Sequence, residues 1–211
     1  MPITPLHYPV AWGLSKLNKK LNLPGLIVGS FIPDIEYLFY FIFFPGFIPD
    51  YFLLHSLIGG AILGTIISVI SIIFIYPLLT SLFFGLDKTR VTEVCRLSPI
   101  LVLSCILGSL FHIILDVFMH RFNSILWPFV DPYNIPGIFS FAFAFIFEGN
   151  IGLGAIWASI LLHTIFAVLM IVLFVKSRRN LWEKILVGNY IEIGNKQVVD
   201  EILGRKTNLY S

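Results

Sequence analysis

Three side chains that bind divalent metal ions well follow one another at intervals of four residues inside an apolar stretch: His112, Asp116 and His120. In an α-helix this spacing places all three on one stripe about 80° wide. A charged side chain in hydrocarbon costs roughly 2.5–3.5 kcal/mol, so the stripe needs a partner that neutralises it. A bound divalent metal ion is such a partner.

Three further residues of the same types precede this stripe: His7, Asp34 and His55. Together with the stripe they make a set of six candidate ligands, two of them carboxylates. Such a set suffices for two metal ions that share a carboxylate and keep open positions for water. Asp116 is the expected bridge, because it shares its stripe with both neighbouring histidines.

The expected grouping assigns Asp34, His55 and His112 to one ion, and His7 and His120 to the other. Zinc is the expected metal from the histidine content, as one or two ions, with manganese or iron as alternatives. The bland alternative is a hydrogen-bonded polar network that packs helices together.

Two more residues are candidates for a catalytic role. Glu36 stands two residues from Asp34, so in a regular helix it points elsewhere; we expect it to orient a histidine N–H. Arg121 follows the stripe and could hold a substrate phosphate, or it could extend its side chain to the membrane surface. His163 stands alone in a later apolar segment and is expected to be a satisfied core histidine.

The elements that position these residues must lie in a membrane. The chain of 211 residues is 57% hydrophobic and 12% charged, whereas soluble domains are about 25% charged. Apolar segments predict an all-α, polytopic helical bundle with about four spans, at 23–44, 51–76, 97–120 and 151–175. We expect a membrane-embedded domain over 1–176 and a cytoplasmic tail over 177–211.

Shorter segments complete this layout. Residues 5–16 predict a short helix with Thr4 as its cap, and 86–96 a basic loop. The alternating stretch 139–147 is expected to be an interfacial or re-entrant helix, because a lone strand in lipid leaves its backbone unpaired. Residues 191–199 could form a hairpin. Gly60 and Gly64 should let another helix approach closely, and Cys95 and Cys105 are expected to be free thiols.

Basic residues predict the orientation. Residues 16–20, 88–96 and 176–184 carry three basic clusters on one side of a four-span layout, and only Arg121 falls on the other side. This predicts an inner (cytoplasmic) membrane protein with both termini in the cytoplasm. His55 and the 112–120 stripe then lie toward the outer leaflet.

The motifs in their order resemble a known family. They are the early His7, the segment 29–36 (Gly-Ser-Phe-Ile-Pro-Asp-Ile-Glu), His55-Ser, the segment 108–116 (Gly-x-x-x-His-x-x-x-Asp) and Trp127-Pro128. Over roughly residues 1–130 the chain resembles bacterial and archaeal inner-membrane proteins identified as metal-dependent hydrolases, and within them a branch known only as domain-of-unknown-function family 4184. The resemblance implies a metal-dependent hydrolase.

The order of candidate ligands is also similar to that of zinc-dependent phospholipase C. That family adds a His-x-x-x-Glu motif, whereas here His163 is followed by Thr-Ile-Phe-Ala. The third metal ion of that family therefore lacks its glutamate in this chain.

The expected function is that of an integral-membrane, metal-dependent hydrolase, a phosphoesterase that acts on a lipid-like substrate among membrane lipids. The alternative is a transporter of metal ions or protons that uses the same intramembrane cluster. Haem ligation by two histidines and a purely structural role are weaker alternatives. No nucleic-acid partner is expected, and the sequence leaves the oligomeric state open.

Overall fold

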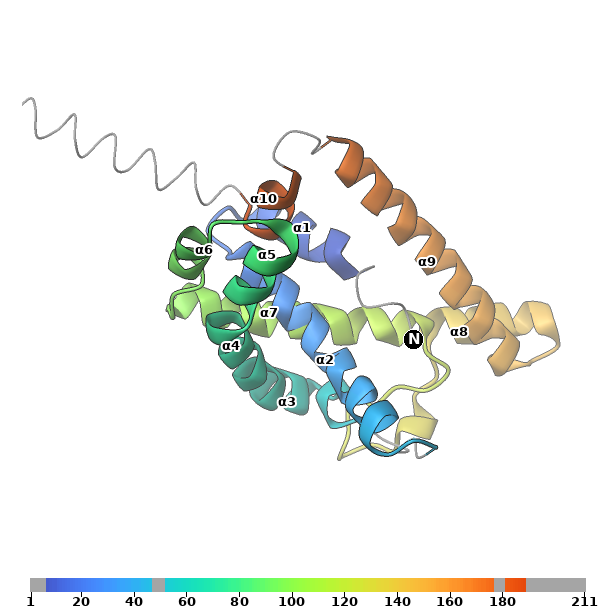
Figure 1. The fold of residues 1–211 in the computed structure, drawn as a ribbon. Helices are drawn as coiled ribbons and strands as arrows, with labels where there is room; N and C mark the ends of the chain where they lie inside the picture. Colours follow the sequence, from blue (N-terminus) through green and yellow to red (C-terminus); the bar gives the residue numbers. More distant parts are fainter. Residues whose placement is uncertain (1–6, 47–51, 177–180, 189–211) are drawn as a thin grey trace, which may run out of the picture.

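The computed structural model describes residues 7–46, 52–176 and 181–188, and every helix labelled in Figure 1 lies there. Four helical stretches are long and apolar enough to cross a membrane: Leu23–Phe43 (α2), Leu57–Phe74, Pro99–Met119 (α7) and Ile151–Lys176 (α9). The predicted all-α, polytopic membrane bundle is confirmed. The predicted cap at Thr4, the start of the second span at Tyr51 and the hairpin over 191–199 lie outside the described residues.

Shorter helices connect the spans. They are α1 (Tyr8–Leu17), the 3₁₀ turn η2 (Leu53–His55), α3 (Leu57–Gly59), the π-helical turn η3 (Gly60–Gly64), α4 (Thr65–Phe74), α5 (Tyr76–Phe84), α6 (Lys88–Val94), the 3₁₀ turn η4 (Pro132–Asn134), α8 (Ile138–Ala144), the 3₁₀ turn η5 (Phe145–Phe147) and α10 (Leu181–Leu186). The second span is therefore built from α3, η3 and α4 in succession.

Glycines and serines let α7 touch two other elements at backbone distance. A Cβ on Gly29 of α2 would collide with the backbone of Cys105, and one on Gly108 of α7 would come within 3.1 Å of the Gly29 Cα. One residue further along α7, the Ser109 hydroxyl donates to the Gly60 carbonyl of η3 over 3.1 Å. The prediction that Gly60 admits a neighbouring helix is confirmed, and that helix is α7.

Polar caps fix where α2 and α7 begin. The Asn22 side chain accepts from the Gly25 N–H over 2.8 Å and donates to the Val94 carbonyl over 2.8 Å. The Ser104 hydroxyl oxygen of α7 accepts from the Asn22 N–H over 2.9 Å. Ser98 caps α7 by accepting from the Leu101 N–H. These bonds set the register of α2 against α7, and that register decides which side chains meet further along.

Two predicted boundaries are wrong. The third span ends at Met119, and His120 has extended backbone (φ −74°, ψ 150°). The Ser140 hydroxyl of α8 lies 2.9 Å from the Met119 carbonyl and 3.0 Å from the His120 carbonyl, so it can donate to either where the helix stops. The predicted loop at 86–96 contains α6, because the Asp87 carboxylate caps a helix start by accepting from the Thr89 N–H.

The stretch 139–147 is helical as predicted, over α8 and η5. A helix satisfies its own backbone hydrogen bonds, whereas alternation alone would have indicated a strand. Its place relative to a bilayer stays a prediction.

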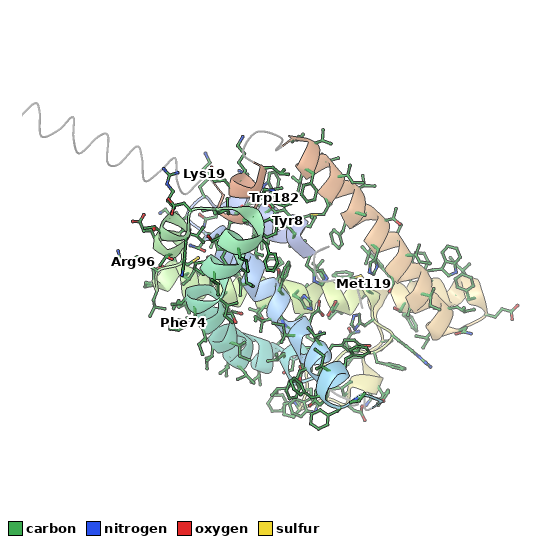
Figure 2. The ribbon with its side chains drawn as sticks, in the orientation of Figure 1. Tyr8, Lys19, Phe74, Arg96, Met119 and Trp182 are labelled. Atoms are coloured by element: carbon green, nitrogen blue, oxygen red, sulfur yellow. The ribbon has the colours of Figure 1, made fainter. Side chains whose placement is uncertain are left out.

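The segment 181–187, which follows α9, packs back onto α1 and α5. Tyr8 of α1 donates to the Ile185 carbonyl over 3.0 Å, and Tyr76 donates to the Leu186 carbonyl over 2.7 Å. Figure 2 shows Tyr8 and Trp182 at this same end of the molecule. The segment 181–187, which the sequence placed in a tail, is thus seated on α1 and α5. Cys95 and Cys105 are free thiols, as predicted, and the structure buries both of them.

Candidate metal centre

Four side chains from three separate elements converge between α2 and α7. Asp34 comes from α2, His55 from η2, and His112 and Asp116 from α7. The Nε2 atom of His55 lies 3.6 Å from Asp34 Oδ1 and 3.5 Å from Asp116 Oδ2. The Nε2 atom of His112 lies 3.5 Å from the same Asp34 oxygen and 3.2 Å from the same Asp116 oxygen. Four ligand atoms thus form a closed ring with each nitrogen between two oxygens.

These spacings fit one tetrahedral ion. Zinc binds histidine nitrogen and carboxylate oxygen at about 2.0–2.2 Å, so two ligands of one tetrahedral ion lie about 3.3–3.6 Å apart. The four measured edges run from 3.2 to 3.6 Å. Charge-assisted N–H···O bonds are shorter, about 2.7–2.9 Å. All four edges are therefore longer than charge-assisted hydrogen bonds, and three of the four fall within the range expected for co-ligands of one metal ion.

Three of the four ring residues, His55, His112 and Asp116, are buried, and their ligand atoms have no ordinary hydrogen bonds among the described residues. His112 is 1% exposed and Asp116 is 4% exposed. Within the part of the chain that the structure describes, the Nε2 atoms of His55 and His112 and both carboxylate oxygens of Asp116 have no hydrogen-bond partner. Buried polar atoms without partners are costly, so this chemistry calls for a further group at the centre.

Backbone contacts explain why these four meet. Gly29 of α2 and Gly108 of α7 touch one helical turn before Asp34 and His112 respectively. Because the two helices cross this closely, their next turns, which carry Asp34 and His112, also lie close together. The contact between Ser109 and Gly60 likewise brings the segment that carries His55 toward α7.

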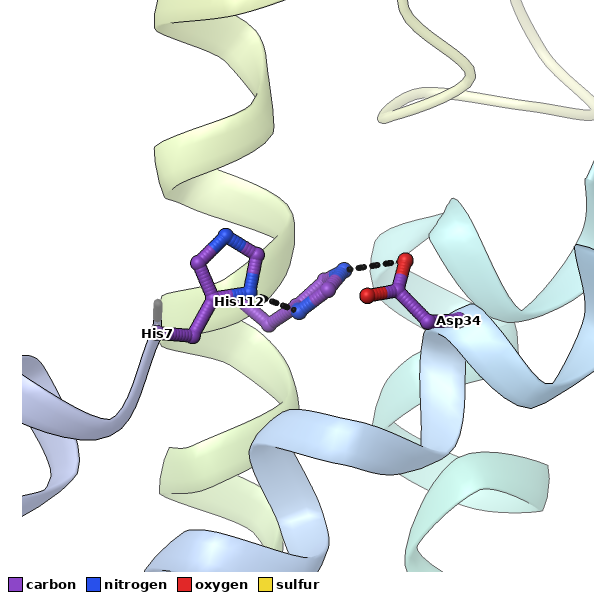
Figure 3. A group of neighbouring side chains, drawn as sticks. All are labelled: His7, Asp34 and His112. Atoms are coloured by element: carbon purple, nitrogen blue, oxygen red, sulfur yellow. Dashed lines mark hydrogen bonds and ion pairs between the residues drawn. The ribbon is translucent and has the colours of Figure 1, made fainter. Parts of the chain in front are cut away.

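His7 lies behind His112. Its Nδ1 atom is 2.6 Å from His112 Nδ1, whereas Asp34 faces the opposite nitrogen of His112 (Figure 3). Among the described residues, His7, Asp34 and His112 form one group whose ligand atoms lie within 4.8 Å of one another, and His55, His112 and Asp116 form a second. Two nitrogens 2.6 Å apart are closer than co-ligands of one tetrahedral ion and fit a hydrogen bond.

The tautomers of this pair follow from chemistry. Burial first, and then the neighbouring His112, lower the pKa of His7 to about 4, so His7 is neutral near pH 7. One of the two facing Nδ1 atoms must carry the proton and the other must accept it. If His112 offers an Nε2 lone pair to a metal ion, then His112 Nδ1–H is the donor and His7 is the acceptor.

His120 faces the other oxygen of the same carboxylate. Its Nε2 atom lies 3.5 Å from Asp116 Oδ1, whereas Oδ2 belongs to the ring. The two oxygens of Asp116 therefore point to two different places, which is what a bridging carboxylate requires. Because His120 leaves the helix, Ser140 rather than helical periodicity holds its backbone in place.

Glu36 holds the turn that presents His55. Its carboxylate accepts from the Leu53 N–H over 2.8 Å and from the Leu54 N–H over 2.6 Å. The same carboxylate lies 3.9 Å from His55 Nδ1, beyond hydrogen-bond distance. Glu36 therefore positions the backbone of η2, while a catalytic role for it stays a prediction.

A cavity of about 800 Å³ opens beside the ring. His55, Asp116 and His120 line it, so the ring is reachable from the cavity. Arg121 lines it as well, with its guanidinium 5.1 Å from the centre of the Phe122 ring. His163 of α9, expected from the sequence to be a core histidine, is also a lining residue.

The structure thus brings together the six predicted ligands: His7, Asp34, His55, His112, Asp116 and His120. The sequence did not single out Ser140, which fixes His120, or Ser109, which brings η3 to α7. The available signal was a serine within an apolar segment: α8 carries Ser140, and α7 carries Ser104 and Ser109.

Comparison with known proteins identifies the family. No curated protein and no solved structure matches the chain. One family profile, described as "Domain of unknown function (DUF4184)", matches residues 1–200. Because the match covers nearly the whole chain, the protein belongs to the DUF4184 family.

Proposed function

We propose that this chain is an integral-membrane hydrolase in which Asp34, His55, His112 and Asp116 hold a divalent metal ion, with zinc favoured over manganese or iron. The substrate class that we propose is a lipid-like phosphoester. The observation that carries the proposal is the ring of four ligand atoms at 3.2–3.6 Å, buried and without hydrogen bonds to the Asp116 oxygens.

A divalent ion with an open position would act as a Lewis acid that lowers the pKa of a bound water and polarises a phosphoryl oxygen. A site with four protein ligands is closed, whereas catalytic zinc sites keep an open position. Asp116 Oδ1 and His120 Nε2 would serve as two ligands of a second ion, and its remaining positions would face the cavity.

The chain's own residues would orient this site. His7 would hold the His112 ring by accepting a hydrogen bond from His112 Nδ1–H. This bond fixes the tautomer in which Nε2 is free to bind the metal. We therefore assign His7 to positioning rather than to direct ligation. Glu36 would position His55 by a different route, because its carboxylate holds the backbone of η2.

Arg121 would bind the substrate phosphate. Its exposed side chain lines the cavity that the ligands border. A guanidinium pairs with two phosphate oxygens at once and would hold the phosphoester near Asp116 and His120. The alternative from the sequence, an arginine that reaches the membrane surface, would leave phosphate affinity unchanged in Arg121→Ala.

The placement in the cell is also a proposal. Four spans with three basic clusters on one side favour the inner membrane, both termini in the cytoplasm and a cavity toward the outer leaflet. Accessibility of cysteines introduced at Lys19 and Phe129 to a membrane-impermeant thiol reagent in intact cells tests this. Labelling of the cysteine at position 19 alone would show the opposite orientation to the one proposed.

The test of the proposed function is elemental analysis of the detergent-purified full chain, together with hydrolysis of phosphatidic acid, phosphatidylglycerol and phosphatidylethanolamine in mixed micelles. Wild type should carry one to two equivalents of zinc or manganese. His112→Ala and Asp116→Asn should lose the metal and the hydrolysis while their circular dichroism stays helical. Glu93→Gln, which removes a carboxylate from exposed α6, should keep both. Wild type without metal, even after supplementation, would refute the proposal.

A transporter of metal ions or protons remains the second candidate, because it would use the same buried cluster. On the side of His112 away from the large cavity, His7 fills the space and leaves a cavity of only about 10 Å³. Zinc uptake into proteoliposomes that is lost in Asp116→Asn, without phosphoester hydrolysis, would favour this candidate.

A further inference from the structure

Helix α9 forms one wall of the large cavity. This wall carries polar side chains near the middle of the apolar span. Ser159, His163 and Thr164 line the cavity together with Asp116 and His120 of the α7 side. His163 is the thirteenth residue of the 26-residue span, about 18 Å along the helix from its first residue. Polar side chains at such a depth mark functional sites more often than surface ones do.

The structure defines which nitrogen of His163 is free to bind a ligand. Its Nδ1 atom lies 2.5 Å from the Ser159 carbonyl oxygen, four residues earlier in the helix. A carbonyl oxygen only accepts, so Nδ1 carries the proton and donates it. In the neutral ring, Nε2 is then an acceptor, and no described residue donates a hydrogen bond to it.

Thr164, the residue after His163, also presents a hydrogen-bond acceptor. The Thr164 hydroxyl donates to the Ile160 carbonyl over 2.8 Å, so its oxygen is left as an acceptor. On the other side of the cavity, the Asp116 carboxylate offers acceptors only. His163 and Thr164 thus both present acceptors on the α9 wall, and these suit a ligand that carries hydrogen-bond donors.

We propose that His163 Nε2 recognises a hydrogen-bond donor, a hydroxyl or an ammonium group, on the head group of the phosphoester lipid that enters this cavity. This inference rests on the proposed function, because it takes the cavity to be the substrate site. It narrows the substrate to phospholipids whose head group carries such a donor.

The cavity has a size and lining that suit a head group. Its volume of about 800 Å³ falls in the range of about 300–1,000 Å³ that ligand sites occupy. Apolar side chains also line it, among them Ile113 and Val117 of α7 and Ile160 of α9. A donor-bearing head group would satisfy His163, while its phosphate would face Arg121 and the ligands.

The test is native mass spectrometry of the detergent-purified, metal-loaded full chain with equimolar phosphatidylglycerol, phosphatidylethanolamine and phosphatidylcholine of identical acyl chains. The first two carry a hydroxyl or ammonium donor, and the third carries none. Wild type should retain at least one donor-bearing lipid about three- to tenfold more than phosphatidylcholine, the ratio that one hydrogen bond supplies.

His163→Phe keeps a ring of similar size but removes the acceptor, so it should lose this preference while it still binds phosphatidylcholine. Leu161→Phe, on the same helix but outside the cavity lining, should keep the preference. A retained preference in His163→Phe, or equal retention of all three lipids by wild type, would overturn the inference.

This experiment is separable from the metal test. Lipid retention needs no turnover, so a wild type that hydrolyses phospholipids but retains the three lipids equally would defeat only this inference. A preference that depends on His163 in a protein that binds no metal would defeat only the proposed hydrolase. Zinc content and gel-filtration elution of His163→Phe, both expected to match wild type, establish that the variant is folded.

Discussion

The imidazole rings of His7 and His112 meet nitrogen to nitrogen, with their Nδ1 atoms 2.6 Å apart, and each is 1% exposed. His7 precedes the first helix and His112 lies in the third span, so the contact joins the start of the described chain to its centre. Because His7 is neutral, its Nδ1 can accept a hydrogen bond from His112 Nδ1–H and so fix the tautomer of His112.

The first prediction concerns this pair. His7→Ala should weaken zinc affinity by roughly tenfold to hundredfold, as removal of a residue that orients a ligand does. His7→Asn should keep most of the zinc affinity, because the amide oxygen can accept a hydrogen bond from His112 Nδ1–H. Competition with a fluorescent zinc chelator measures both. Equal losses in the two variants would instead mean that His7 binds the metal directly.

The second prediction separates the two ion positions. His120 faces Asp116 Oδ1, away from the ring that uses Oδ2. If two ions bind, His120→Ala should lose one equivalent of metal and the hydrolysis, while the ring keeps its ion. Elemental analysis at rising zinc concentrations measures this. Loss of all metal in His120→Ala would contradict the proposed division, and His112→Ala, expected to lose the ring ion, is the comparison.

The third prediction tests the packing that builds the site. A methyl group at Gly108 would overlap the backbone of α2 near Leu26 and Ser30, so Gly108→Ala should cost about 1–3 kcal/mol of unfolding free energy. Its thermal midpoint in detergent should fall, and its zinc affinity should fall as well. Gly13→Ala is the matched control, because nothing lies within 4 Å of the added methyl group in α1. Equal midpoints in both variants would contradict the packing argument.

The fourth prediction concerns the thiols. Cys95 and Cys105 are at most 1% exposed, and burial raises the pKa of the Cys95 thiol to about 12. A raised pKa keeps the thiol protonated at pH 8, and the thiolate is the reactive form. Maleimide should therefore label folded wild type slowly and both thiols after denaturation in dodecyl sulfate.

Leu17→Cys supplies the exposed control for this measurement, since Leu17 is 86% exposed at the end of α1. It should label at once in the folded protein. Labelling of wild type at the rate of that variant would show that the region around Cys95 opens readily.

Composition and spacing were enough to predict the architecture. Four apolar segments of about 20 residues predict spanning helices, because backbone polar groups in lipid must be paired within the segment. The same argument gave the helix over 139–147 against its strand-like alternation. The types of the six candidate ligands were also legible, since histidine and aspartate are rare in such segments.

The roles of those residues depended on tertiary contacts. Helical periodicity predicted that His112, Asp116 and His120 share a stripe, but α7 ends at Met119 because the chain leaves toward α8, where Ser140 holds the His120 carbonyl. Periodicity also could not separate His7 from the ligand ring. That distinction rests on a 2.6 Å contact between residues 105 positions apart.

The sequence by itself therefore determined the membrane class, the number of spans and the residue types of the candidate site, because hydrophobicity and ligand chemistry are local properties. Only the tertiary structure decided that Asp34, His55, His112 and Asp116 form one ring with edges of 3.2–3.6 Å. That spacing depends on how closely α2 and η3 approach α7 at Gly29, Gly108 and Gly60, and the approach of two backbones is a property of the packed helices rather than of any one segment.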